Sequence, residues 1–283
     1  MNEIKRNYRQ DLYLLKREYK QSRRQLKSQY LSEKRARRST FKQEFDNAKA
    51  SENVNISGVS APVGGQSNVK LAGFAPRRTV LEEIGNAVSH GAGSLFAIFA
   101  LVTMLINSDN PAQKAAAYVY GVGMFIMFTM SCLYHSFRYG SGVKRLFRRF
   151  DYLSIYLLIG ATFAPLLLCY APQNFGLVFF IVQWVIIVVG ITLVAVFGPA
   201  RLRKIHIPLY IILGWSGLIL IPTMIIRKDF ALLWWILGGG LLYTVGMIPF
   251  AVDKRVAHFI WHLFVLFGAV VQWVGIYTCI YAV

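Results

Sequence analysis

Charged residues are scarce in this sequence. They make up 16% of the 283 residues, whereas 55% are hydrophobic and 14% are aromatic. Soluble domains carry about 25% charged residues. The composition therefore excludes an ordinary soluble protein and indicates a membrane protein. Acidic residues are scarcer than basic residues: there are 13 Asp and Glu and 31 Lys and Arg, which gives a net charge of +18.

A secretory signal is also lacking, because no apolar core follows the first basic residues. Residues 1–50 hold fifteen Lys and Arg and six Asp and Glu, which is half of the net excess. We expect this segment to be a basic, helical extension in the cytosol. An apolar stripe at helical spacing predicts contact with an anionic leaflet; it consists of Ile4, Tyr8, Leu12, Leu15 and Tyr19. A solvated tail is the alternative, and nucleic-acid binding is disfavoured for an anchored tail.

Residues 51–78 are rich in Ser, Asn, Gly and Pro and predict a flexible linker. From residue 79 to the C-terminus the sequence predicts one all-α domain, a polytopic bundle of seven transmembrane helices. Each apolar segment is near the ~20 residues that a helix needs to cross a bilayer. The segments are Ile84–Ile106, Ala115–Phe137, Phe150–Tyr170, Phe175–Phe197, Ile205–Ile226, Ala231–Phe250 and Ala257–Ala282.

Basic residues are concentrated in alternate loops. Residues 138–149 contain five Lys and Arg, residues 201–204 contain three, and Lys254 and Arg255 precede the last span. Lys and Arg are retained on the cytoplasmic side. The pattern predicts a cytoplasmic N-terminus and an extracellular C-terminus. In that topology Cys132 faces the cytosol and stays reduced, while Cys169 and Cys279 fall near the outer face and could pair.

No histidine lies in the middle of a predicted span, and all five fall in the inner half of the membrane. His258 and His262 are one turn apart on a helix, close enough to share a metal ion. His135 ends the second span, and Asp151 is expected at the start of the third. Ionisable groups at membrane depth usually face a bundle interior or a wet cavity. We therefore expect one polar site on the cytoplasmic side.

Zinc is the metal that these residues favour. Three imidazoles plus water form the open tetrahedral arrangement of reactive zinc sites. His135, His258 and His262 are the predicted ligands. Asp151 is expected to hydrogen-bond the bound water or an imidazole, and Ser131, one turn before His135, to donate into the same cavity.

Other polar and small residues have simpler interpretations. His206 follows a basic loop and is expected to cap a helix or to hydrogen-bond across helices. The role of His90 is left undecided: it is either a residue of the site or a packing residue. Gly91 and Gly93 favour close helix packing over phosphate binding, because no strand precedes them.

Four blocks of the sequence resemble the hemolysin III branch of the progestin and adipoQ receptor family. They are Glu82–His90, Ser131-x-x-x-His135, Phe150-Asp151-Tyr152 with Gly160–Pro165 downstream, and His258-x-x-x-His262. The resemblance covers residues from Arg78 onward. It implies seven helices, an inside N-terminus and zinc held by His135, His258 and His262, with Asp151 near the bound water. The basic N-terminus and Gln272, where relatives often have histidine, depart from the pattern.

Three functions follow as hypotheses. The first is a zinc-dependent hydrolase of lipid amides, in which Asp151 orients or deprotonates water, because the resemblance implies lipid substrates. The second is a sensor or regulator of membrane state in which zinc is structural. The third, a pore-forming hemolysin, is disfavoured because no file of polar residues crosses the outer half of the spans. The resemblance also implies a bacterial plasma membrane, with membrane lipids as partners.

Overall fold

The structure is a computed structural model that describes residues 78–252 and 256–282, together with scattered residues between 14 and 44. It divides into two units, Met1–Ser67 and Asn68–Val283. The described residues of the first unit are helical, and Tyr19 among them is exposed. The rest of the predicted apolar stripe, from Ile4 to Leu15, lies outside the described residues, as does the predicted linker up to residue 77.

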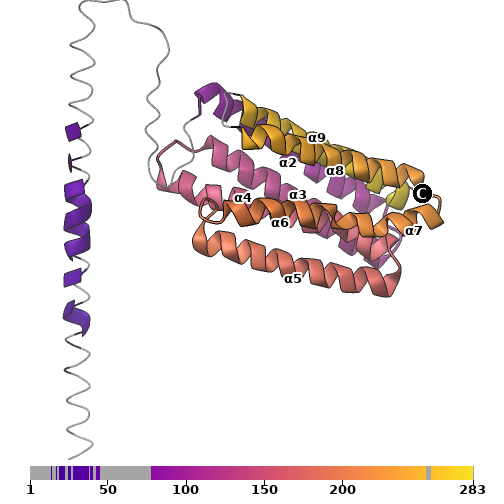
Figure 1. Cartoon of the computed structure of the whole chain (residues 1–283), viewed down its shortest axis with the longest axis horizontal. Helices are drawn as coiled ribbons and strands as arrows, with labels where there is room; N and C mark the ends of the chain where they lie inside the picture. Colours follow the sequence, from indigo (N-terminus) through magenta and orange to yellow (C-terminus); the bar gives the residue numbers. More distant parts are fainter. Residues whose placement is uncertain are drawn as a thin grey trace, which may run out of the picture. The chain divides into compact units, whose positions relative to one another are not determined.

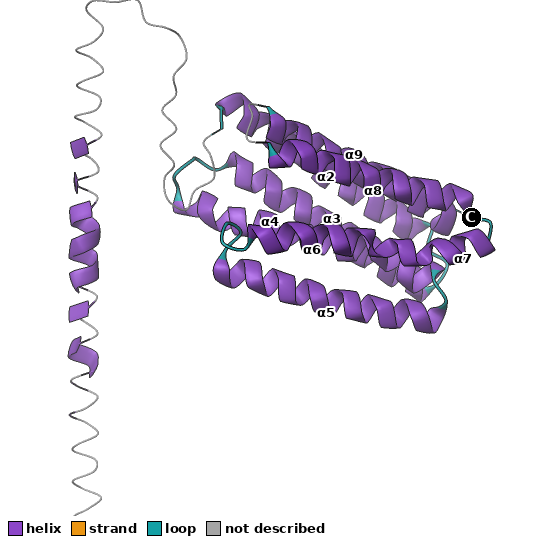
Figure 2. Ribbon diagram, in the orientation of Figure 1, coloured by secondary structure: helices purple, strands orange, loops and turns teal. Residues whose placement is uncertain are grey.

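Seven helical spans in the described part of the second unit are long and apolar enough to cross a membrane, and Figures 1 and 2 show them as an all-helical bundle. The predicted all-α, seven-helix fold is confirmed, and the chain is a multi-pass membrane protein. The elements are α2 (Val80–Ile106), α3 (Pro111–Ser136), α4 (Gly142–Pro165) with the π turn Leu166–Tyr170, α5 (Gln173–Phe197), α6 (Arg203–Trp215) with the 3-10 turn Ser216–Leu220 and α7 (Ile221–Ile226), α8 (Phe230–Ala251), and α9 (Ala257–Ile276) with the π turn Tyr277–Tyr281.

The third span begins earlier than predicted, at Gly142 instead of Phe150. Ser141 caps it by accepting a hydrogen bond from the backbone N–H of Lys144. The first two turns of α4 contain four basic residues. A search for apolar segments in the sequence therefore does not detect these turns, although they are helical. As a result, Asp151 lies in the third turn of α4 and not at its start, and Lys144 belongs to a helix and not to a loop.

The fifth span is not the continuous α-helix that the apolar run predicts. It passes through the 3-10 turn Ser216–Leu220 before α7. Pro222 explains the change, because proline has no N–H to donate to the preceding turn. The break leaves the span length sufficient to cross a membrane.

The helices pack against one another as neighbouring pairs. α2 contacts α3 and α9, α3 contacts α4, and α8 contacts α9. Small residues permit these close approaches: a Cβ at Gly93 would lie 2.4 Å from Phe128, and one at Gly123 would lie 2.3 Å from the Cβ of Ala161. The packing role predicted for Gly93 is confirmed. Large apolar side chains point outward elsewhere, as expected of surfaces that face lipid, for example Val178, Val185 and Val189 of α5.

Candidate metal centre

Two of the predicted ligands lie one turn apart at the start of α9. The Nε2 atoms of His258 and His262 are 3.2 Å apart, and their ring centroids are 4.8 Å apart. α9 is held at this end from another helix, since the backbone N–H of Val256 donates to Oε1 of Glu82 in α2. The same glutamate forms a capping box with Thr79.

The third predicted ligand comes from the last turn of α3. The ring of His135 lies 4.7 Å from that of His262 and 5.3 Å from that of His258, measured between centroids. One ligand atom from each of the three histidines lies within 4.8 Å of the other two. The structure thus brings together residues that are more than a hundred positions apart in the chain, in an arrangement that could hold a metal ion.

The donor atoms fit a metal ion. Two nitrogens bound to one tetrahedral zinc at about 2.0–2.1 Å would be about 3.3 Å apart, close to the 3.2 Å between the Nε2 atoms on α9. The Nε2 atom of His135 is buried and has no hydrogen-bond partner in the described part of the chain. A buried nitrogen without a partner is costly, and a bound cation would satisfy it.

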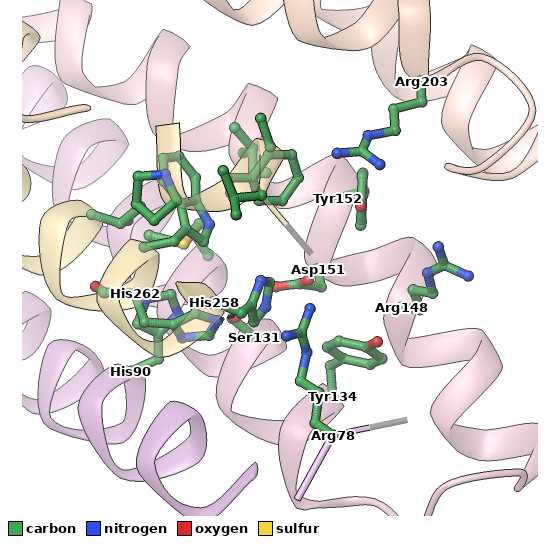
Figure 3. Close-up of a pocket in the computed structure, with 18 residues that line it drawn as sticks. Arg78, His90, Ser131, Tyr134, Arg148, Asp151, Tyr152, Arg203, His258 and His262 are labelled. Atoms are coloured by element: carbon green, nitrogen blue, oxygen red, sulfur yellow. Dashed lines mark hydrogen bonds between the residues drawn. The ribbon is translucent and has the colours of Figure 1, made fainter. Parts of the chain in front are cut away.

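Ser131 and Asp151 lie beside the histidines, as Figure 3 shows. Ser131 is one turn before His135 on α3, and its side chain hydrogen-bonds the Asp151 carboxylate of α4. Both residues line a polar cavity of about 150 Å³ with His258 and His262. Three basic residues also line this cavity, namely Arg78, Arg148 and Arg203. The cavity therefore combines nitrogen donors, one carboxylate and the hydroxyl groups of Ser131, Tyr134 and Tyr152.

An apolar pocket of about 140 Å³ adjoins the polar cavity. It extends between α4, α6, α8 and α9, and its lining is largely apolar. Five residues line both spaces, namely Met127, Ile155, Phe250, Trp261 and Val265. The polar cavity and the apolar pocket are therefore adjacent halves of one amphipathic region.

Sequence reasoning assigned no site role to Glu83, Asn86 and Lys144. Glu83 Oε2 is 2.5 Å from Nδ1 of His135, and its Oε1 is 2.9 Å from Nζ of Lys144. The side-chain amide nitrogen of Asn86 is 3.3 Å from the same His135 nitrogen. Helical spacing was a usable signal, because Glu83, Asn86 and His90 follow at intervals of three and four residues and share one face of α2.

The remaining histidines are accounted for separately. His90 lies against the site: its ring centroid is 3.8 Å from that of His262, and its Nε2 is 3.3 Å from the His262 carbonyl oxygen. It is not one of the three clustered donors. His206 is buried elsewhere, with Nδ1 2.9 Å from the hydroxyl of Tyr156. The hydrogen bond across helices predicted for His206 is therefore confirmed.

All three cysteines are free, so the pairing of Cys169 with Cys279 that the sequence left open is not formed. Cys132 is partly buried where α3 meets α2, since its sulfur lies 3.5 Å from the position of a Cβ at Gly91. None of the cysteines is among the clustered metal donors.

Comparison with known proteins finds relatives over the part of the chain that contains this site. Residues 78–273 match a family described as Haemolysin-III related. Hemolysin-3 of Bacillus cereus is 36% identical over 197 residues, which cover 67% of this chain and 88% of that protein. The Hemolysin-3 homolog of Bacillus subtilis (strain 168) is 31% identical over 196 residues, 68% of this chain and 91% of that protein.

A human protein is similar as well. The Monocyte to macrophage differentiation factor of Homo sapiens is 26% identical over 211 residues, which cover 72% of this chain and 86% of that protein. The region matched by the family contains six spans and most of α9, and with them His135, Asp151, His258 and His262. The chain belongs to the hemolysin III branch of the progestin and adipoQ receptor family.

Proposed function

We propose that this protein is a zinc-dependent hydrolase of lipid amides. The main observation behind the proposal is that the apolar pocket adjoins the polar cavity, which is lined by Asp151, His258 and His262 and lies next to the cluster that these two histidines form with His135. A lipid amide has a polar group that is cleaved and an acyl chain that is apolar. The two adjacent spaces suit these two parts.

Zinc is the proposed metal because all three clustered donors are imidazoles, and three histidines leave a coordination position open. When bound by three histidines, zinc supplies a Lewis acid that activates water at neutral pH. Calcium and magnesium prefer oxygen ligands, which makes them poor candidates for a site of three nitrogens.

The side chains of the cavity have distinct proposed roles. Asp151 accepts a proton from the attacking water, as a carboxylate within reach of that water can do. Ser131 donates its hydrogen bond to Asp151 and so keeps the carboxylate turned into the cavity. The apolar pocket holds the acyl chain and keeps the amide carbonyl near the histidines. A proton acceptor of this kind contributes roughly 10²–10⁴-fold to the rate.

Fatty acid release tests this function directly. The zinc-loaded protein in proteoliposomes is expected to release fatty acid from at least one member of a panel of N-acyl sphingoid bases, N-acyl ethanolamines and N-acyl amino acids. Mass spectrometry of the extracted lipids measures the release. The matched control is the same preparation of His258→Ala/His262→Ala. Equal release from both preparations, for every lipid of the panel, would contradict the hydrolase.

A regulator of membrane state with structural zinc is the second candidate. It is supported by the position of the donors on α3 and α9, two helices that both pack against α2. A metal held by both helices would stabilise their relative position even without catalysis. This candidate predicts that the carboxylate of Asp151 is dispensable, as tested below.

The proposed location is a bacterial cell membrane, with membrane lipids as partners of the bundle and of the basic N-terminal segment. The alternation of basic loops supports a cytoplasmic N-terminus and an extracellular C-terminus. An epitope at the C-terminus is therefore expected to bind antibody on intact spheroplasts, and one at the N-terminus only after permeabilisation. Labelling in the opposite order would reverse the assignment and place the metal site on the outer side.

A further inference from the structure

α2 contributes none of the three clustered histidines, yet one of its carboxylates makes a close contact with one of them. Oε2 of Glu83 lies 2.5 Å from Nδ1 of His135. The side chain of His135 is fully buried, and that of Glu83 is 19% exposed. The contact therefore lies inside the bundle, where solvent competes little for either group.

This contact determines which ring nitrogen of His135 remains available to a metal ion. A carboxylate can only accept hydrogen bonds, and Glu83 Oε2 at 2.5 Å is much closer to Nδ1 than the Asn86 amide nitrogen at 3.3 Å. The imidazole hydrogen is therefore placed on Nδ1 and the lone pair of the ring on Nε2. Nε2 is the atom of His135 that is buried without a hydrogen-bond partner among the described residues. Histidines that bind metals commonly donate their other ring N–H to a carboxylate in this way.

The carboxylate of Glu83 is itself held in place. Its second oxygen, Oε1, is 2.9 Å from Nζ of Lys144, which also donates to the carbonyl oxygen of Phe137 at 3.1 Å. Lys144 is 5% exposed. Each oxygen of Glu83 thus has one partner, so rotation of the carboxylate would break one contact or the other. The three helices α2, α3 and α4 meet in this chain of contacts.

We propose that Glu83 is the positioning residue of the metal centre, and that it orients His135 so that Nε2 points to the metal. The inference rests on the metal site proposed above. It assigns to α2 a role in metal affinity, although α2 carries no ligand. The competing explanation is that Glu83 only balances the buried charge of Lys144, because an uncompensated buried charge is costly.

Three variants separate the two explanations: Glu83→Gln, Lys144→Met and Glu83→Gln/Lys144→Met. The full-length protein in detergent is stripped of metal, and its zinc affinity is measured by competition with a chromophoric chelator. Visible absorption of the cobalt-loaded protein reports the ligand geometry. Thermal unfolding of the metal-free protein reports stability. None of the three measurements depends on catalysis.

Glu83→Gln is expected to weaken zinc binding by about 10–100-fold, the usual effect of losing such a partner, and to change the cobalt spectrum. The double variant is expected to show the same weakening, although its metal-free stability recovers because no buried charge is left alone. Lys144→Met, which keeps the carboxylate, is expected to bind zinc much more tightly than either. If Glu83→Gln does not fold, the zinc affinity of the double variant is compared with that of the wild type and of Lys144→Met instead.

Zinc affinity and a cobalt spectrum like those of the wild type in the double variant would overturn the inference, because Glu83 would then be only a counterion. That result would leave the proposed metal site standing. Wild-type protein that binds neither zinc nor cobalt would overturn both the metal site and the role of Glu83.

Discussion

Replacing His258 and His262 together by alanine is expected to abolish metal binding. The wild-type protein, purified without chelator, should contain on the order of one zinc per chain if the proposed site is correct, because three clustered imidazoles would hold zinc with one coordination position open. One remaining imidazole cannot retain the ion through purification, so the double variant should contain almost none. Inductively coupled plasma mass spectrometry of the detergent-purified proteins measures the difference.

His206→Ala is the matched control for this result. His206 is a fully buried histidine of the same bundle, but its partner is Tyr156 and it is not among the clustered donors. Its loss should cost about 1–3 kcal/mol of stability, because the buried hydroxyl of Tyr156 is left without its partner, and should leave the zinc content unchanged. Wild-type protein without metal would contradict both zinc hypotheses, and His135, His258 and His262 would then be packing residues.

Replacing Asp151 by asparagine is expected to lower the rate of lipid amide hydrolysis by roughly 10²–10⁴-fold while zinc stays bound. Asparagine keeps the size of the side chain and its bond with Ser131, but it cannot accept a proton from water. The measurement pairs the rate of fatty acid release with the zinc content of the same sample, so that loss of metal is separated from loss of chemistry.

Asp229→Asn serves as the control, since it makes the same exchange in a carboxylate that accepts a hydrogen bond from Tyr170 and does not line the polar cavity. It should leave the rate unchanged. An Asp151→Asn protein that hydrolyses as fast as the wild type would exclude Asp151 as the proton acceptor. The structural role of the metal would be favoured by a different pair of results. In that case neither the wild type nor the Asp151→Asn protein hydrolyses lipid amides, while the Asp151→Asn protein still binds zinc and keeps its biological activity.

Much of the candidate site could be predicted because its parts are local in the sequence. The four-residue spacing of His258 and His262 places them on one helical face whatever the rest of the chain does. Ser131 and His135 share a face for the same reason. The start of α4 could not be predicted in this way, because a search for apolar segments does not detect helical turns that contain several basic residues. The predicted span therefore begins too late, which places Asp151 at the helix start and Lys144 in a loop.

The contacts between helices could not be predicted from spacing at all. The sequence did contain Glu83 at helical spacing from Asn86 and His90, but nothing local indicates that this face of α2 meets His135. The apolar pocket next to the cavity is equally invisible in the sequence, since it is formed by residues from at least four helices. Each helix by itself shows only an apolar surface.

The sequence alone determined that this chain forms seven apolar helical spans, because span length and composition follow from the thickness and the polarity of a bilayer. It also determined which residues carry nitrogen and carboxylate groups near one end of those spans. Only the tertiary structure decided that α3 and α9 bring three histidines together beside Asp151, and that Glu83 and Lys144 connect α2 and α4 to that group. The reason is physical: helix periodicity is a local property of the backbone, whereas the distance between ligands on different helices depends on how their small and large side chains pack.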